Sequence, residues 1–272
     1  MPEGPEMQRA ADEIAAVLLN KKAQTVSFGL PALQRFTKKL AGRRVTSVTC
    51  RGKAVLIGFS GGLTIFTHNQ LYGRWYMEPV KQRPNTKRQL RLCIETNKHA
   101  ALLYSASNIA VLDQNELKLH PYLSKLGPDA LDSTFSAAQL SKRLNDVEFS
   151  GRGLSSLYLD QGFLGGIGNY LRSEILFKAG INPTLKANEL SAVQRDRLAR
   201  VSLSLTRRSY KTGGVTNDPK IVKQLRGSGV PWEKLRFFVF ARAGRPCHVC
   251  GTKVRKTQMA GRRLYFCPKC QA

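Results

Sequence analysis

Apolar residues near the start of the chain recur with the spacing of a helix that buries one face. Within residues 5–19 they fall at Met7, Ala10, Ala11, Ile14, Val17 and Leu18. This spacing predicts an amphipathic helix, and the polar residues 20–22 mark its end. Such a helix would carry the amino terminus of the chain at its tip.

From residue 25 to about residue 113 the pattern changes to short apolar runs separated by turn-like residues. Strands are predicted at 25–30, 44–50, 54–59, 63–67, 73–77, 89–95, 100–104 and 109–112. Many short strands with few helical segments between them are typical of a β-sandwich or barrel. With the leading helix packed against it, a mixed domain is expected over residues 1–130.

After residue 136 the pattern becomes helical. Helices are predicted at 137–144, 169–179 and 191–206, with a short apolar segment at 154–159, a basic loop at 207–214 and a partial helix at 217–229. A short helix is also predicted at 114–118, before a connection rich in proline and glycine. These segments indicate a helical domain over residues 131–230. Strand-like runs from residue 237 indicate a third domain over 237–272.

The net charge indicates a polyanionic partner. The chain has 44 Lys+Arg against 18 Asp+Glu, a formal charge of +26. Solubility needs far less, and nucleic acid is the commonest partner of such a field. A membrane surface is the alternative, but no apolar run is long enough to span a bilayer and no secretion signal begins the chain. We therefore expect a cytoplasmic protein with no membrane partner.

The cysteines predict a metal site near the end of the chain. Four of the six form two Cys-x-x-Cys pairs separated by sixteen residues, namely Cys247, Cys250, Cys267 and Cys270. This spacing is typical of a four-cysteine zinc site, which has no open coordination position, so one structural Zn²⁺ is expected. His248 lies inside the first pair and is expected not to be a ligand. Cys50 and Cys93 lie in apolar runs and are expected to be buried free thiols.

The first residues offer an unusual nucleophile. Once the initiator methionine is removed, Pro2 presents a secondary amine, with the carboxylates of Glu3 and Glu6 close along the chain. The pKa of a free α-amino group is about 8, so much of it is unprotonated near neutral pH. Such an amine can attack an aldehyde-like carbon and form an iminium. The alternative is that Pro5 and the acidic residues merely start a helix.

Three further motifs are weak by themselves. Lys53 follows Arg-Gly between two strands, where a solvated lysine is the simplest interpretation. A glycine-rich run at 161–168 precedes Asn169, which either caps a helix or belongs to a phosphate-binding turn. The turn at residues 70–72 is either a hairpin with two core residues or a wedge that fills the gap left by an extruded nucleotide.

In this order the motifs resemble the formamidopyrimidine-DNA glycosylase/endonuclease VIII family of base-excision repair enzymes. The resemblance covers essentially the whole chain and rests on Pro2-Glu3-Gly4-Pro5-Glu6, Arg51-Gly52-Lys53, Asp160-Gln161-x-Phe163-x-x-Gly166-Ile167-Gly168-Asn169-Tyr170 and the four-cysteine finger. Gly4, and Gln70-Leu71-Tyr72 after His68-Asn69, look like the bacterial endonuclease VIII branch. The implied fold is α+β and multidomain: an N-terminal β-sandwich with a leading helix, a helix–two-turn–helix domain and a C-terminal four-cysteine zinc finger.

The resemblance implies a role for each matching residue. Pro2 would attack the sugar C1′, Glu3 would act as general acid, and Glu6 would support them. Lys53 would contact phosphate and assist strand cleavage. The void left by the extruded nucleotide would be filled by Gln70, Leu71 and Tyr72. Phosphate contacts would come from Lys125, Asn169 and Arg262, with Arg263 competing for the place of Arg262. At position 125 this branch often has an arginine. Lys125 keeps the positive charge but cannot form the two parallel hydrogen bonds that a guanidinium makes to a phosphate.

The implied activity is a bifunctional DNA glycosylase and AP lyase. It would remove oxidised pyrimidines from duplex DNA through a Schiff base at Pro2 and cut the strand by β,δ-elimination. A monomer that acts on damaged double-stranded DNA is expected, with structural zinc and no redox cofactor. Two alternatives remain, namely an oxidised-purine glycosylase of the same family and a non-catalytic zinc-ribbon DNA-binding protein.

Overall fold

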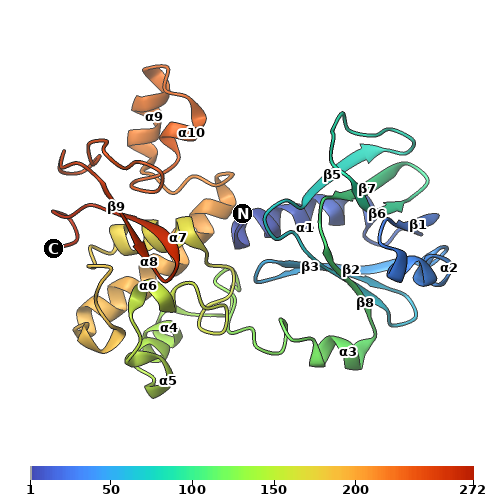
Figure 1. Ribbon diagram of the computed structural model, residues 1–272, viewed down its shortest axis with the longest axis horizontal. Coiled ribbons are helices and arrows are strands. Elements are labelled where there is room, and N and C mark those ends of the chain that lie inside the picture. Colours follow the sequence, from blue (N-terminus) through green and yellow to red (C-terminus); the bar gives the residue numbers. More distant parts are fainter. Residues whose placement is uncertain (1) are drawn as a thin grey trace. The chain divides into compact units, whose positions relative to one another are not determined.

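The computed structural model describes residues 2–272, and these form two compact units (Figure 1). Unit 1 ends at Lys125 and unit 2 begins at Leu126. Among the described residues, no helix combines the length and the apolar character needed to cross a membrane.

Unit 1 is built from two antiparallel sheets of four strands each. The strand orders are β1-β6-β7-β5 and β2-β3-β4-β8. The bounds are β1 Thr25–Phe28, β2 Val45–Arg51, β3 Ala54–Phe59, β4 Thr64–His68, β5 Arg74–Pro79, β6 Leu90–Glu95, β7 His99–Tyr104 and β8 Asn108–Leu112. Buried side chains of both sheets share one core, which confirms the predicted sandwich. The eight predicted strands are all present, with ends shifted by one or two residues.

The leading helix α1, Gly4–Leu18, completes this core and confirms the predicted amphipathic helix. Its buried face contains Met7, Ala11, Ile14 and Leu18. At its start the Glu6 carboxylate accepts a hydrogen bond from the backbone N–H of Glu3, at 3.0 Å. Together with a proline in the first turn, this reciprocal contact explains why the helix begins here.

Residues 31–40 form a helical connection that the apolar pattern does not predict. A 3₁₀ helix, η1 (Pro31–Phe36), leads into a single α-helical turn, α2 (Thr37–Leu40). The first strand therefore ends at Phe28, two residues earlier than expected, because Pro31 starts the helical segment. The short helix α3, Gln114–Leu119, lies where the sequence predicts one.

Unit 2 contains helices around a second core. The helices are α4 Ala137–Leu144, α5 Val147–Ser150, α6 Leu154–Leu157, α7 Asn169–Lys178, η2 Ala187–Glu189, α8 Ala192–Lys211, α9 Pro219–Gly227 and α10 Trp232–Leu235. Leucines and isoleucines at helical spacing on α4, α7 and α8 meet in this core, which confirms the predicted helical region.

The predicted loop at residues 207–214 is wrong in its first part, because α8 continues to Lys211. Arg207 donates hydrogen bonds to the backbone carbonyls of Asp132 and Phe135, at 3.0 and 3.1 Å. Ser209 is buried and its hydroxyl lies 2.8 Å from that of Tyr170. Polar residues that look solvated in the sequence therefore have partners in the unit and sustain the helix.

The chain ends in a hairpin of two strands, β9 (Arg255–Met259) and β10 (Arg262–Phe266). Ala260 and Gly261 between them have φ angles of 52° and 67°, as a type I′ turn requires. The strand-like runs predicted from residue 237 are confirmed by β9 and β10, but residues 237–240 form no strand. Leu264 of β10 joins the helical core, so the hairpin packs on the helices of unit 2.

Candidate active site and metal centre

Pro2 lies at the tip of α1, where it lines a cavity of about 290 Å³. Glu6 and Arg9 of α1 also line this cavity, and the turn after β4 contributes Leu71 and Tyr72. The structure therefore brings the predicted nucleophile together with two of the three predicted wedge residues. Met1 lies outside the described residues, so the structure does not test its predicted removal.

The two acidic residues of the opening segment occupy different environments. Glu3 is buried, with 3% of its surface exposed, and it precedes the first residue of α1. Glu6 is half-buried and its carboxylate is held on both sides, by the backbone N–H of Glu3 and by Arg9 at 3.5 Å. The Glu6 carboxylate therefore fixes the backbone of Glu3, the residue next to Pro2.

The wedge residues sit on a tight turn that holds two apolar side chains in solvent. Leu71 and Tyr72 are 55% and 66% exposed, so the interpretation of both as core residues is wrong. The turn closes through a hydrogen bond of 2.7 Å from the Gly73 N–H to the Asn69 carbonyl. A Cβ at position 73 would lie only 2.6 Å from that carbonyl oxygen, so the turn requires glycine. Gln70 has a positive φ of 49°, and its side chain accepts a hydrogen bond from Ser107.

Lys53 lies at the tip of the β2–β3 hairpin in the same unit. Its backbone N–H donates to the Tyr122 hydroxyl, at 2.8 Å, and the Tyr122 ring packs edge-on against His68, 5.4 Å between centroids. Burial and the charge of Lys53 lower the pKa of His68 below its usual 6.5. His68 Nδ1 accepts the backbone N–H of Gln70, at 3.0 Å. His68 thus connects the surroundings of Lys53 with the wedge turn.

Asn169 is the first residue of α7, and its N-cap is Gly168, so the interpretation of Asn169 as the cap is wrong. The Asn169 Oδ1 accepts a hydrogen bond of 2.7 Å from Arg172, which is fully buried. Arg172 also donates to the backbone carbonyls of Met259 and Arg263 in the hairpin. Because the amide oxygen is engaged, the amide NH₂ of Asn169 is the group that can donate to a phosphate.

The two hairpin arginines point to opposite faces of β10. Arg262 shares a face with the buried Leu264, while Arg263 shares the other with Tyr265, because side chains alternate along a strand. Both arginines are exposed. Lys125, the remaining predicted phosphate contact, is exposed at the last residue of unit 1.

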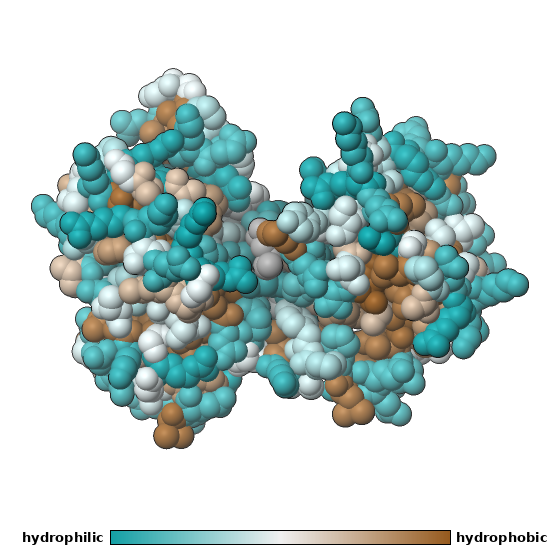
Figure 2. All heavy atoms as spheres, in the orientation of Figure 1, coloured by the Kyte–Doolittle hydropathy of each residue, from teal (hydrophilic) through white to brown (hydrophobic). Residues whose placement is uncertain are grey.

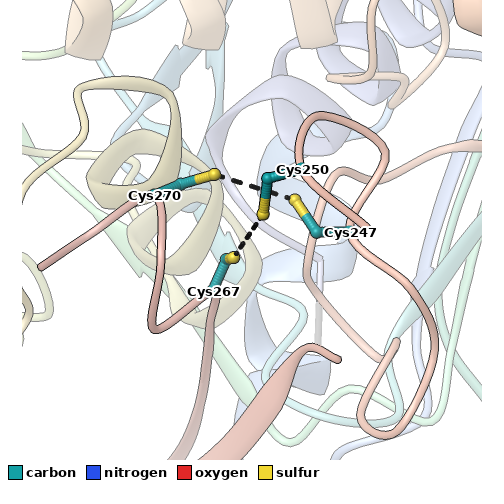
Figure 3. Close-up of side chains that lie close together, drawn as sticks. All are labelled: Cys247, Cys250, Cys267 and Cys270. Carbon is teal, nitrogen blue, oxygen red and sulfur yellow. Dashed lines mark hydrogen bonds between the residues drawn. The ribbon is translucent and has the colours of Figure 1, made fainter. Parts of the chain in front are cut away.

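The four paired cysteines converge, as the spacing predicts (Figure 3). Their sulfur atoms all lie within 4.8 Å of one another, with Cys250 and Cys267 3.4 Å apart and Cys247 and Cys270 4.0 Å apart. Zinc–sulfur bonds of about 2.3 Å in a tetrahedron put sulfurs about 3.8 Å apart, so the spacing fits a zinc ion. His248 is not part of the cluster; it contacts Arg242.

The pKa values of these thiols are shifted in opposite directions. Hydrogen bonds from Thr252 lower the pKa of Cys250 to about 6, whereas burial raises the pKa of Cys247 and of Cys270. Four thiolates this close repel one another, and a divalent cation removes that cost. Of the other two cysteines, Cys93 is buried as predicted, whereas Cys50 is only half-buried and its thiol lies 3.6 Å from the Gly52 carbonyl oxygen.

Two buried residues that the sequence pattern does not reveal hold the chain on either side of the cysteine cluster in place. The Glu174 carboxylate accepts the backbone N–H groups of Phe238, Val239 and Phe240, at 2.8 to 2.9 Å. Gln271 accepts the N–H of Cys267 and donates to the carbonyl of Ile181. The sequence around Gln271, Tyr122 and His68 gives no sign that these residues position others. For Arg172 and Glu174 the one sign is a charged side chain within a helix that is otherwise largely apolar.

Sequence profiles of three protein domains match successive parts of the chain. The formamidopyrimidine-DNA glycosylase N-terminal domain matches residues 1–108, and the H2TH domain of the same enzymes matches residues 126–219. A zinc finger found in FPG and IleRS matches residues 244–272.

Full-length relatives and solved structures agree with these matches. The chain is 44% identical over 271 residues to endonuclease 8 of Klebsiella pneumoniae and 43% identical to endonuclease 8 of Escherichia coli, with 100% of both chains covered in each case. The fold resembles Lactococcus lactis Fpg (MutM) bound to N7-benzyl-Fapy-dG DNA, with a TM-score of 0.82 at 19% identity over 99% of both chains. It also resembles MutM bound to DNA containing carbocyclic 8-oxo-G, with a TM-score of 0.81 at 20% identity over 99% of both chains.

Proposed function

The chain belongs to the formamidopyrimidine-DNA glycosylase/endonuclease VIII family of DNA repair enzymes, and we propose that it removes oxidised pyrimidines from duplex DNA and then cuts the strand. The observation that supports this most directly is the cavity in which Pro2 meets Leu71 and Tyr72. A nucleophile beside an exposed apolar wedge suits a reaction on a base that has left the stack. The identity of 42–44% to endonuclease 8 proteins over the full chain favours the pyrimidine branch.

The first step is removal of the damaged base. The amine of Pro2, free once Met1 is absent, bonds to C1′ of the sugar, and the electron pair of the N-glycosyl bond leaves with the base. The proton that the amine loses balances the one that the departing base takes up. Glu3 gives its proton to the ring oxygen as the C1′–O4′ bond opens, leaving an iminium between Pro2 and C1′. Glu3 is buried and follows Pro2 directly in the chain, which suits this assignment.

The second step is strand cleavage. The iminium withdraws electrons, so C2′ loses a proton and the C3′–O bond breaks with its electron pair going to the phosphate. Loss of a further proton from C4′ breaks the C5′–O bond in the same way, and water then releases Pro2. Lys53 contacts a phosphate near the lesion and assists these eliminations. None of these steps requires a redox cofactor.

The other predicted residues bind DNA. Leu71, Tyr72 and Gln70 fill the void in the duplex, while Asn169, Lys125 and the hairpin arginines hold phosphates, Arg262 and Arg263 on opposite faces of β10. One Zn²⁺ held by the four cysteines stiffens the hairpin that carries those arginines. With no open coordination position the ion takes no part in the chemistry. We expect one chain to act as a monomer in the cytoplasm, without a membrane partner.

Borohydride trapping tests the enzymatic proposal. Reduction of the iminium would join wild-type protein covalently to a duplex that contains thymine glycol, provided that mass spectrometry shows Met1 to be absent. Glu3→Gln should lose about 10²–10⁴-fold in base removal yet still be trapped on a pre-formed abasic site, because part of that sugar is already open as an aldehyde. Absence of an adduct from the processed wild-type protein would favour the non-catalytic DNA-binding alternative.

A comparison of lesions decides between the two branches of the family. Single-turnover rates on thymine glycol and on 8-oxoguanine opposite cytosine should favour the pyrimidine lesion. The purine lesion represents the alternative within the family, since the profile that matches residues 1–108 is that of formamidopyrimidine-DNA glycosylase. A faster rate on 8-oxoguanine would assign the chain to the purine branch.

A further inference from the structure

A second hollow lies in unit 1 and is formed by β1, η1 and α2. Figure 1 draws β1 and α2 at the end of unit 1 away from the amino terminus. The hollow has a volume of about 520 Å³ and is lined by β1, η1 and α2 through Ser27, Phe28, Gln34, Arg35, Thr37 and Lys38. The 15 residues of α1, which begins beside Pro2 and runs along the unit, span roughly 22 Å at about 1.5 Å per residue. The hollow and the amino-terminal cavity share no lining residue, so the two are separate.

The chemistry of this hollow suits a phosphate backbone. Its lining combines two cations, two hydroxyls and an amide, and no carboxylate contributes to it. The elements β1, η1 and α2 contain no Asp or Glu, and Glu95 of the neighbouring strand β6 is already bonded to Thr25 and Arg83. Among the described residues, no ion pair involves Arg35 or Lys38. The positive charge of the hollow is thus left for an external anion.

Aromatic contacts order the cations at the edge of the hollow. The Arg35 guanidinium lies 4.9 Å from the centroid of the Phe36 ring, and the Lys39 ammonium lies 5.7 Å from it. Such contacts restrict long side chains before a ligand arrives, which reduces the entropy lost on binding. Arg35, Lys38 and Lys39 are all exposed, so their charges are accessible to a ligand, and Figure 2 shows hydrophilic side chains along the outer edge of unit 1.

We propose that this hollow binds the sugar–phosphate backbone of a DNA segment other than the one held at the amino-terminal cavity. Arg, Lys, Ser, Thr and Gln are the side chains that contact phosphates in protein–DNA complexes, and such contacts carry no sequence information. The hollow would therefore add affinity for undamaged duplex and keep the protein on DNA between lesions. The inference rests on the proposed DNA-repair function, because it takes DNA as the polyanion.

The test is the salt dependence of binding to undamaged duplex DNA. Arg35→Gln/Lys38→Gln should bind more weakly, and the slope of log affinity against log salt should fall by about 0.9 for each phosphate that the variant no longer neutralises. Lys98→Gln/Lys118→Gln removes the same charge from exposed positions elsewhere in unit 1 and serves as the matched control. The charge-keeping variant Arg35→Lys/Lys38→Arg should restore most of the slope.

Cleavage of a lesion-containing duplex separates this inference from the proposed function. With enzyme in excess, the single-turnover rate of Arg35→Gln/Lys38→Gln should equal that of the wild type. Equal salt slopes for this variant and its control would overturn the inference even in an active enzyme. A reduced single-turnover rate would also overturn it, since the hollow would then belong to the active site. A wild-type protein that cleaves no lesion but shows the slope difference would refute the proposed function alone.

Discussion

Glu174 is a single carboxylate that organises a segment with no acidic residue of its own. From residue 234 to residue 272 the sequence has no Asp or Glu, and the backbone N–H groups of residues 238–240 all point to Glu174. Burial raises the pKa of Glu174, while hydrogen bonds from Thr216 and from these N–H groups oppose that shift. Such a group is costly to change, because its neighbours are donors that need an acceptor.

Glu174→Gln should therefore destabilise unit 2 strongly. One amide end would place N–H donors against the backbone donors of residues 238–240, so we expect a loss of roughly 2–4 kcal/mol of unfolding free energy. Urea unfolding of the wild type and of the variant measures this difference in unfolding free energy. Glu148→Gln, at an exposed position, is the control and should change stability little. A Glu174→Gln protein as stable as that control would contradict the assigned role.

His68 makes stability depend on pH in one direction. Its pKa is lower in the folded state, through burial and then the charge of Lys53, than the usual 6.5. As pH falls below about 6.5, the unfolded chain takes up the proton first. The contribution of neutral His68 is therefore complete above that pH and is lost as pH falls through the folded pKa. Between about pH 7 and 5 the wild type should lose more unfolding free energy than His68→Gln. If the unfolding free energies of the two proteins change in parallel over this pH range, the effect is excluded.

At the scale of elements, the wedge depends on one glycine. Gly73→Ala would put a methyl group 2.6 Å from the Asn69 carbonyl, so the turn must open, at a cost of roughly 1–3 kcal/mol. Under the proposed function, base removal from a thymine glycol duplex should slow about tenfold or more. Cleavage of a pre-formed abasic site should slow less, because less must be extruded there. Gly151→Ala, where a Cβ meets nothing within 4 Å, is the control.

Elements with local periodicity were predictable, and those that depend on distant partners were not. The first helix, the eight strands and the four-cysteine spacing follow from short-range patterns. The end of α8 does not, because Ser209 finds its partner in Tyr170, 39 positions away. The orientation of Asn169 depends on Arg172, and that of Arg172 on a hairpin about 90 positions further along. The family resemblance, rather than periodicity, supplied the roles proposed for Pro2, Glu3 and Lys53.

At the scale of the whole molecule, the metal centre and the helices of unit 2 form one structural system. Leu264 of the hairpin lies in the helical core, and Gln271 joins Cys267 to the carbonyl of Ile181. Unit 1 has its own core, formed by the sandwich and α1. Loss of the metal should therefore disturb unit 2 and leave unit 1 folded.

Cys267→Ser should lose zinc and most DNA affinity while unit 1 remains folded. Removal of one of four ligands destroys a closed site, and the arginines of β10 then lose their fixed positions. Metal analysis, DNA titration and the retained β-sheet signal in circular dichroism measure the three outcomes. Cys50→Ser, at a half-buried cysteine outside the cluster, is the control. DNA affinity unchanged in Cys267→Ser would contradict the role proposed for the finger.

The basic character of the segment that carries the four cysteines has a practical consequence. Residues 234–272 carry the basic side chains Lys234, Arg236, Arg242, Arg245, Lys253, Arg255, Lys256, Arg262, Arg263 and Lys269. Trypsin cuts after such residues, but only where the backbone can open into its active site. The paired strands and the converging cysteines keep much of this backbone out of reach of the protease, so a metal ion held by the cysteines would protect this basic stretch from cleavage. After brief digestion with trypsin, the fraction of protein left uncut in this segment would then measure the fraction of molecules that hold the metal.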